Sequence, residues 1–144
     1  MKGYKNILLA VELNAKTDAE PIKHAEYMAK ECGAKVTLVH AVEYAIGYNA
    51  YGVGINLEVE EILVNNSNKV MKNLGEKIGV SEERRRVKIG PAKYVILEEA
   101  DKMKADLIIM GSHGSHGLRA ILGSTADGVL HGAKCDVLAV KLKE

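Results

Sequence analysis

The run Asn6-Ile-Leu-Leu-Ala-Val11 (NILLAV) decides the fold. From Ile7 to Val11 it is apolar at every position, and it is bounded by the polar residues Asn6 and Glu12. An unbroken apolar run of this length is typical of a β-strand that is buried on both of its faces. Such strands occur in parallel sheets that helices cover from both sides. We therefore predict an inner strand of an α/β sheet here.

Working outward from this run, short apolar segments alternate with helical patterns. We predict further strands over residues 35–42, 86–89, 105–110 and 136–142. We also predict four helices. The first ends near Gly33, the second spans about 56–78, the third begins at Pro91 and the fourth spans 124–132. Thr17 or Asp18 is predicted to cap the first helix. Apolar residues at helical spacing are predicted to face inward in the first two helices: Ile22, Ala25, Ala29 and Cys32, then Leu63, Val70, Leu74 and Ile78.

This alternation of strands and helices predicts the topology. Right-handed crossovers leave few arrangements, and the simplest is a Rossmann-like α/β fold, a doubly wound, five-stranded parallel sheet in the order 3-2-1-4-5 with helices on both faces. We expect residues 1–144 to form a single domain of this kind. Residues 43–56 carry three glycines and three tyrosines without a clear period and are predicted to be a long loop. The loop either covers a site with Tyr44, Tyr48 and Tyr51 or lies on the surface beside a dimer contact.

The composition excludes several classes of partner. With 20 basic and 19 acidic residues the net charge is +1, which argues against a nucleic-acid-binding protein. The cluster Arg84-Arg85-Arg86 is predicted to lie on a solvated turn. Cys32 and Cys135 are far apart and outside any CxxC pattern, so we expect two reduced thiols in a cytoplasmic protein. The first apolar run is too short for a signal peptide, and none is long enough to span a membrane.

The stretch GSHGSHGLRAILGSTAD, from Gly111 to Asp127, follows the fourth predicted strand. In the order 3-2-1-4-5 the strand order reverses between the first and the fourth strand. Ligands bind at the carboxyl ends of strands beside such a point, and this stretch begins there. Glycines permit a close backbone approach, and a helix N-terminus attracts anions. Ser124 and Asp127 resemble a capping box. From residue types alone, a phosphate site and a simple turn before a capped helix remain equally open.

Other chemistries have weaker support. No GxGxxG follows the first strand, and no Gly-Lys-Ser/Thr occurs, so neither the dinucleotide fingerprint nor the P-loop is present. His113 and His116 lack further ligands nearby, and we predict no metal site. No GxSxG nucleophile elbow occurs and we name no catalytic residue, so the expected activity is at most slow ATP hydrolysis or autophosphorylation. His40 is expected to be a hydrogen-bonded structural histidine.

The segments NILLAVE, KVTLVHAV, ADLIIMGSHG and GSTADGVLHGAKCDVLAVKL together resemble the universal stress protein family, of the UspA type. The resemblance spans the whole chain. It implies a cytoplasmic stress-response protein that forms a homodimer by pairing the C-terminal strands, Val137 to Leu142 in this chain. Pairing would cover an apolar edge strand that is otherwise prone to aggregation.

One branch of this family binds ATP through the pattern G-x-x-G, nine residues, then G-[ST]. Here Gly111 to Gly114 and Gly123-Ser124 match, but only the eight residues 115–122 separate them. The resemblance implies a site for ATP or AMP, with or without Mg²⁺. In this site Glu12 and Ala41 would contact the nucleoside. The phosphates would contact Gly111, Gly114, Gly123, Ser124 and Thr125. Glu12 stands where the resemblance places an aspartate. Ser115 stands where relatives often carry a basic residue, and Arg119 would have to compensate for that lost charge. The alternative is a homodimeric interaction module that binds no nucleotide.

Overall fold

The computed structural model describes residues 3–43, 47–49, 52–54, 57–112 and 123–142. Its main sheet has five parallel strands in the spatial order β5-β2-β1-β6-β7. Counted along the chain within this sheet, that is the predicted order 3-2-1-4-5. The strands are β1 (Asn6–Ala10), β2 (Lys35–Val42), β5 (Arg85–Ile89), β6 (Leu107–Ser112) and β7 (Asp136–Lys141).

The opening run forms the central strand, as predicted. Ile7, Leu8 and Leu9 of β1 are completely buried. Because side chains alternate along a strand, Ile7 and Leu9 belong to the core on one face of the sheet and Leu8 to the core on the other. An apolar residue is therefore needed at each of these three positions.

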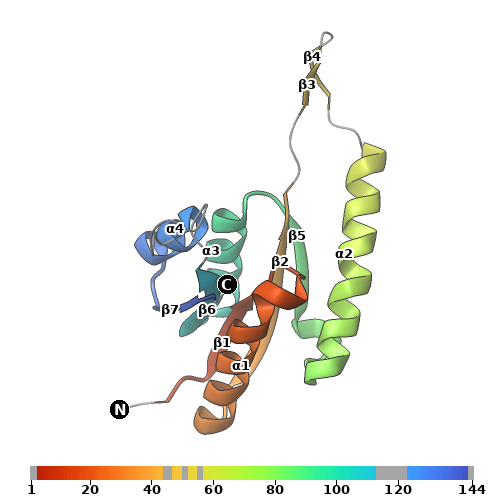
Figure 1. Cartoon of the computed structure of the whole chain (residues 1–144). Helices are drawn as coiled ribbons and strands as arrows, with labels where there is room; N and C mark the ends of the chain where they lie inside the picture. Colours follow the sequence, from red (N-terminus) through yellow and green to blue (C-terminus); the bar gives the residue numbers. More distant parts are fainter. Residues whose placement is uncertain (1–2, 44–46, 50–51, 55–56, 113–122, 143–144) are drawn as a thin grey trace.

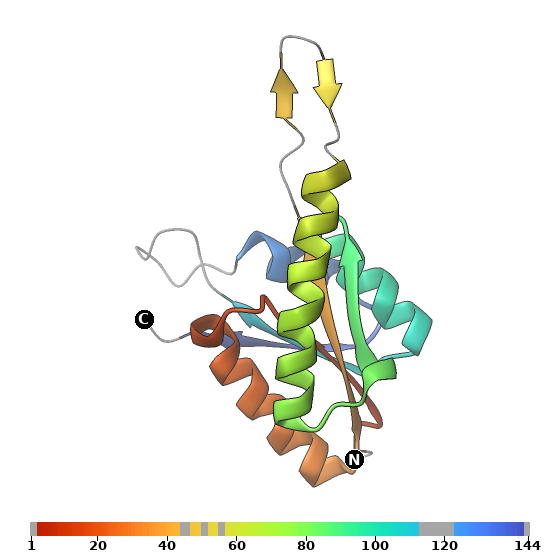
Figure 2. The ribbon, with the colours of Figure 1, turned by 90° about the vertical axis from the view of Figure 1, so that its right-hand side faces the viewer.

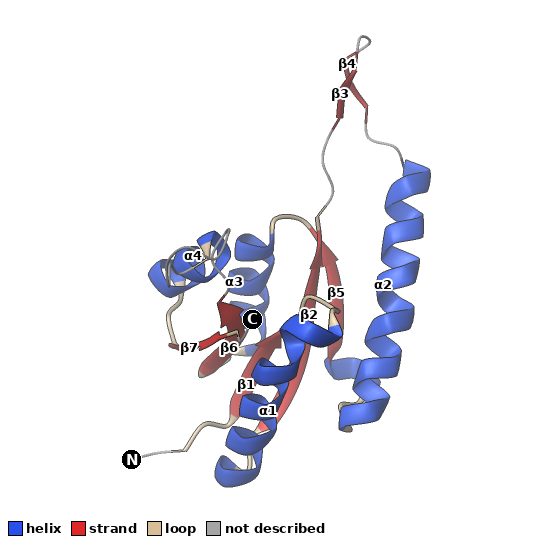
Figure 3. Cartoon of the chain, in the orientation of Figure 1, coloured by secondary structure: helices blue, strands red, loops and turns tan. Residues whose placement is uncertain are grey.

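Two helices cover each face of the sheet (Figures 1 and 2). Helices α1 (Ala15–Cys32) and α2 (Leu57–Ile78) pack on the core that contains Leu9, and α3 (Ala92–Met103) and α4 (Ser124–Gly132) pack on the core that contains Leu8. A short 3-10 helix, η1 (Glu82–Arg84), leads into β5. Figure 3 shows the alternation of strands and helices that the sequence pattern predicts.

The start of α1 differs from the prediction. Asn14 caps the helix, because its Oδ1 accepts hydrogen bonds from the backbone N–H groups of Lys16 (2.9 Å) and Thr17 (3.4 Å). The prediction that Thr17 or Asp18 is the cap was wrong. Asp18 is buried instead, and its carboxylate accepts hydrogen bonds from the backbone of Glu12 (2.8 Å) and Asn14 (3.1 Å). Burial raises the pKa of Asp18 above its usual range, although these hydrogen bonds oppose the shift.

The predicted loop over residues 43–56 contains a hairpin. The strands β3 (Gly47–Asn49) and β4 (Gly52–Gly54) pair antiparallel, so the prediction of a structureless loop was wrong for these residues. The hairpin stands beyond the sheet, near the start of α2 (Figure 1). Strands of three residues are too short for a periodic pattern to reveal them. Tyr44 and Tyr51, named above for a covering role, lie outside the described residues.

The prediction of a solvated turn was wrong for two of the three clustered arginines, whereas Arg84 ends the turn η1 beside the exposed residues Glu82 and Glu83. Arg85 and Arg86 begin β5. The Nε of Arg85 donates to the carbonyl of Val80 (2.8 Å), and Nη1 of Arg86 pairs with Oε1 of Glu99 (3.4 Å). Both guanidinium groups therefore bind within the chain.

The two cysteines do not form a disulfide, as predicted. Cys32 and Cys135 are free and half-buried. Burial raises the pKa of the Cys135 thiol, which lowers its thiolate fraction and hence its reactivity.

Tyr4 ties the N-terminal segment to β7 and supplies a prediction about pH. Its hydroxyl donates to Oδ2 of Asp136 (2.7 Å), and this hydrogen bond raises the pKa of Tyr4 above 10.0. We expect Tyr4→Phe to lower the free energy of unfolding by about 0.5–1 kcal/mol at neutral pH. Because the folded state holds the proton more tightly, this contribution is present below pH 10 and is lost as pH rises through the folded pKa. Urea unfolding of both proteins from pH 7 to 11 measures it, and a difference that stays constant or grows above pH 10 would contradict it.

Candidate functional site

A cavity of about 680 Å³ opens at the carboxyl end of the sheet, where the strand order reverses between β1 and β6. Its walls come from the ends of β1, β2 and β6, from the first residues of α3 and α4, and from one stretch of α2. Parallel strands end at the same edge of a sheet, so residues that are far apart in the sequence meet here.

The cavity brings together six of the predicted site residues, which are Glu12, Ala41, Gly111, Gly123, Ser124 and Thr125. They come from four separate segments of the chain. The seventh predicted residue, Gly114, lies within 113–122 and therefore outside the described residues. Arg119 and Ser115, which bear on the charge and length of the predicted phosphate loop, lie there too.

Glu12 and Ala41 occupy the wall formed by β1 and β2. Glu12 is exposed, and its backbone is held by the hydrogen bond to buried Asp18. Leu13, which follows, has a φ of 61°, so the chain turns sharply there before α1 begins. Ala41 is half-buried near the end of β2, where its methyl group leaves the cavity open. This wall thus carries one carboxylate beside a small apolar surface.

The N-terminus of α4 forms the opposite wall. Gly123 is the N-cap residue, with φ −60° and ψ 153°, and Ser124 is the first residue of the helix. The predicted capping box of Ser124 and Asp127 was therefore wrong, and among the described residues no side chain hydrogen-bonds to this cap. The first backbone N–H groups of α4 meet the cavity together with the hydroxyl-bearing residues Ser124 and Thr125. This combination suits an anion.

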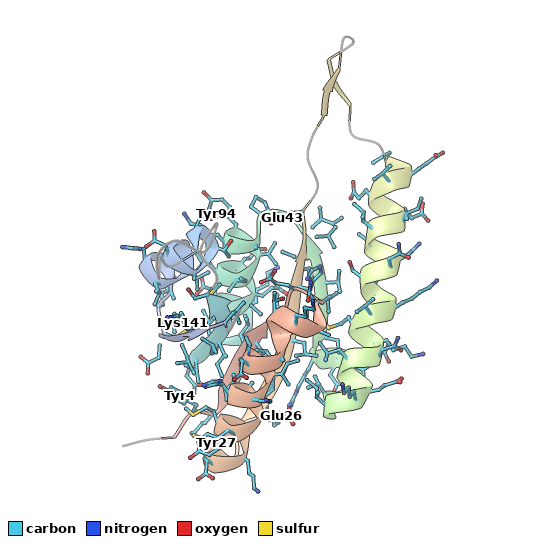
Figure 4. All side chains as sticks on the ribbon, viewed as in Figure 1. Tyr4, Glu26, Tyr27, Glu43, Tyr94 and Lys141 are labelled. Atoms are coloured by element: carbon cyan, nitrogen blue, oxygen red, sulfur yellow. The ribbon has the colours of Figure 1, made fainter. Side chains whose placement is uncertain are left out.

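The N-terminus of α3 also reaches the cavity, but an internal carboxylate occupies it. Oε1 of Glu43 accepts a hydrogen bond from the backbone N–H of Ala92 (2.7 Å), and Figure 4 shows Glu43 beside the start of α3. The two helix ends therefore differ within the described part of the chain, because Glu43 caps α3 and no described side chain caps α4. Sequence reasoning missed Glu43, since the contact joins residues 49 positions apart.

His40 has both a structural role and a place on the cavity. Its Nδ1 lies 2.8 Å from the carbonyl oxygen of Val11, as expected for a hydrogen-bonded structural histidine. A carbonyl can only accept, so Nδ1 donates, and Nε2 of the neutral ring is then a hydrogen-bond acceptor. His40 also lines the cavity, which was not predicted.

Gly111 has a packing role in addition to its place on the cavity. A Cβ atom at this position would lie 3.2 Å from a methyl group of Leu142, which follows β7. A side chain here would press on Leu142, so this glycine has a packing role that is independent of any ligand.

Metal binding and membrane insertion find no support in the described part of the chain. There, no group of three or more His, Cys, Asp or Glu side chains is arranged to hold a metal ion. His113 and His116 fall outside it. Among the same residues, no helix combines the length and the apolar character that a membrane crossing requires.

Comparison with known proteins gives a consistent result. The model of the universal stress protein family matches residues 3–141. Universal stress protein A homolog 2 of Coxiella burnetii is 44% identical over 144 residues, which cover 99% of each chain. Among solved structures, UspA from Lactobacillus plantarum has a TM-score of 0.74 at 20% identity, covering 96% of this chain and 98% of that one. A universal stress protein in complex with cAMP has a TM-score of 0.64 at 20% identity, covering 98% and 99%.

These two solved structures show the fold alone, whereas the family model and the Coxiella relative cover nearly the whole chain. The segments that resemble the family span the same range, and the sheet order agrees with the fold that they imply. The chain belongs to the universal stress protein family.

Proposed function

We propose that this chain is a cytoplasmic stress-response protein that binds an adenine nucleotide, ATP or AMP, in the cavity at the switch point. The observation that carries the proposal is the N-terminus of α4. It is not capped by a side chain of the described residues, and it lies across one cavity from Glu12 and Ala41. Free N–H groups and the helix dipole stabilise a phosphate at such a place.

The opposite wall suits a nucleoside. A ribose presents hydroxyl donors, which the carboxylate of Glu12 can accept. Adenine presents a flat apolar surface and an exocyclic amino donor, which match Ala41 and the acceptor Nε2 of His40.

The charges around the cavity favour a ligand with few phosphates. The ionisable residues that line it are Glu12, His40 and Glu43, and no lysine or arginine is among the described lining residues. A triphosphate therefore needs Mg²⁺, or Arg119 from the phosphate loop, to offset its charge. AMP carries fewer negative charges and therefore needs less compensation by positive charge. The neighbour in fold that is in complex with cAMP binds a ligand with a single phosphate, which supports this preference.

Thermal unfolding of the purified protein with adenosine, AMP, ATP and ATP with Mg²⁺ tests this proposal. A ligand that binds only the folded state raises stability by RT ln(1 + [L]/Kd), about 2.7 kcal/mol at a concentration of 100 Kd. We expect AMP and magnesium ATP to raise the melting temperature and guanine nucleotides to raise it less. If no adenine nucleotide raises it at millimolar concentration, the proposal is wrong.

The edge position of β7 favours a second candidate function, a homodimeric interaction module that binds no nucleotide. In the main sheet β7 pairs with β6 on one side only. A second copy could extend the sheet by pairing along β7, from Asp136 to Lys141. A molecular mass of two chains together with no thermal response to any nucleotide would favour this function. For the nucleotide-binding function we propose at most slow ATP hydrolysis or autophosphorylation.

A further inference from the structure

Two helices bring their N-termini to the same cavity, and Glu43 makes these two ends unequal. The cavity of about 680 Å³ is lined by Ala92 at the start of α3 and by Ser124 at the start of α4. Each helix start carries a partial positive charge and backbone N–H groups that attract an anion. A ligand with a phosphate therefore meets two competing ends, and the difference between them decides where the phosphate binds.

Glu43 occupies the end of α3 with its own carboxylate. It follows β2 directly, and its Oε1 accepts a hydrogen bond of 2.7 Å from the backbone N–H of Ala92, the first residue of α3. The residue before Ala92 is Pro91, which has no N–H group to donate. The Glu43 carboxylate therefore takes the first backbone donor that α3 can offer to a ligand.

The backbone on both sides of this contact is fixed. The N–H of Gly90 donates to the carbonyl of Val42 (3.1 Å), so the turn between β5 and α3 is fastened to the end of β2, one residue before Glu43. Gly90 has a φ of 141°, a conformation that favours glycine. The strand end and the helix start thus hold the Glu43 carboxylate at a defined place on the cavity wall.

No lysine or arginine of the described residues forms an ion pair with Glu43. Lys93, which follows Ala92, points elsewhere: its methylene groups pack against Gly128 of α4, and its ammonium group lies 5.1 Å from the centre of the Tyr94 ring. Lys93 is not among the residues that line the cavity. The negative charge of Glu43 therefore acts on whatever enters the cavity.

From the occupied end of α3 and the charge on the cavity wall, we propose that Glu43 is a specificity-determining residue. It directs the phosphate of a ligand to α4 and selects ligands with one phosphate over ligands with several. This inference rests on the nucleotide-binding function proposed above. Glu43 acts by repulsion, which at a separation of roughly 8 Å lowers affinity by about two- to fivefold for each unit of negative charge on the ligand.

Calorimetric titration of the full chain with adenosine, AMP and ATP, without Mg²⁺ and at low ionic strength, tests this proposal. Glu43→Gln keeps the length of the side chain and an acceptor for Ala92 but removes the charge. We expect AMP to bind more tightly to this variant than to the wild-type protein, and ATP to gain more than AMP does. The ratio of the ATP affinity to the AMP affinity should rise by at least about fourfold, because ATP carries two more negative charges. Adenosine is uncharged, so its affinity should stay the same.

Three controls separate the charge of Glu43 from its role as a cap. Glu98→Gln removes the same charge from an exposed position of α3 that does not line the cavity, and it should leave the affinity ratio unchanged. Glu43→Asp keeps the charge and should retain nearly the wild-type ratio. Salt at about 0.5 M screens charges, so it should reduce the difference between Glu43→Gln and the wild-type protein. A purely structural cap would instead change the affinities of all three ligands alike and would not respond to salt in this way.

The possible results distinguish this inference from the proposed function. If AMP and ATP bind but their affinity ratio is the same in Glu43→Gln and the wild-type protein, Glu43 does not select the ligand, and the nucleotide-binding function still holds. An equal rise of the ratio in Glu98→Gln would also overturn the role of Glu43, because it would show an effect of net charge alone. If neither nucleotide binds to any of these proteins while circular dichroism shows them folded, the proposed function is wrong and this inference falls with it.

Discussion

Ser124→Asp is expected to weaken the binding of ATP and AMP by at least about 30-fold, or about 2 kcal/mol. Ser124 is the first residue of α4 and lines the cavity. A carboxylate here would stand within a few ångströms of a phosphate bound at the helix end, where like charges repel by several kcal/mol in partly buried surroundings. The substitution also removes a hydroxyl donor.

The same substitution should have the opposite effect on the unliganded protein. An acidic side chain in the first turn interacts favourably with the helix dipole, so we expect the free energy of unfolding to rise by about 0.3–1 kcal/mol. Calorimetric titration and urea unfolding measure the two effects separately. A loss of both stability and binding would indicate damage to the fold instead.

Two controls locate the phosphate. Ser124→Ala removes the hydroxyl without adding charge and should weaken binding by no more than about 10-fold. Adenosine lacks a phosphate, so its affinity should be the same for Ser124→Asp and the wild-type protein. If Ser124→Asp binds AMP as tightly as the wild type does, the phosphate does not lie at α4.

Glu99→Ala is expected to lower the free energy of unfolding by about 3 kcal/mol. The Glu99 side chain is only 3% exposed, and it pairs with Arg86 of β5 (3.4 Å) and with Lys102 (3.5 Å). Alanine leaves a cavity and removes the carboxylate partner of a guanidinium group that is itself 30% exposed. The pair joins α3 to an edge strand of the sheet, so its loss should loosen that helix.

Glu98 provides a matched control on the same helix. It also pairs with Lys102, at the shorter distance of 2.9 Å, but its side chain is 65% exposed. Exposed ion pairs contribute little, so Glu98→Ala should lower the free energy of unfolding far less than Glu99→Ala does. Glu99→Gln keeps the shape and a hydrogen-bond acceptor and should fall between the two. Equal losses for Glu98→Ala and Glu99→Ala in urea unfolding would show that burial does not decide the effect.

The sheet and its order were predictable because their signals are local. A strand buried on both faces needs apolar residues at consecutive positions, and Ile7 to Val11 show this directly. Alternation with helical patterns and the handedness of crossovers then restrict the topology. From the topology alone, Glu12 and Gly111 could be placed at the same edge of the sheet.

Details within one turn of a helix were less predictable. Asn14, Thr17 and Asp18 are all residue types that cap helices, and only the geometry shows that Asn14 does so while Asp18 is buried. Val70 and Met71 are both apolar neighbours, and a rotation of about 100° decides which of them is buried. Composition does not distinguish such alternatives, because each residue suits either place.

By itself, then, the sequence determined the order of the strands and the residues at the carboxyl edge of the sheet, since these follow from the periods and the alternation of its elements, and its motifs indicated the family. Only the tertiary structure decided that Glu43 occupies the N-terminus of α3, that the N-terminus of α4 has no side-chain cap among the described residues, and that Val70 of α2, which was wrongly predicted to face inward, is exposed. Those features depend on which distant segments pack together. The period of a helix or strand shows which of its side chains share a face. It does not show which other part of the chain packs against that face.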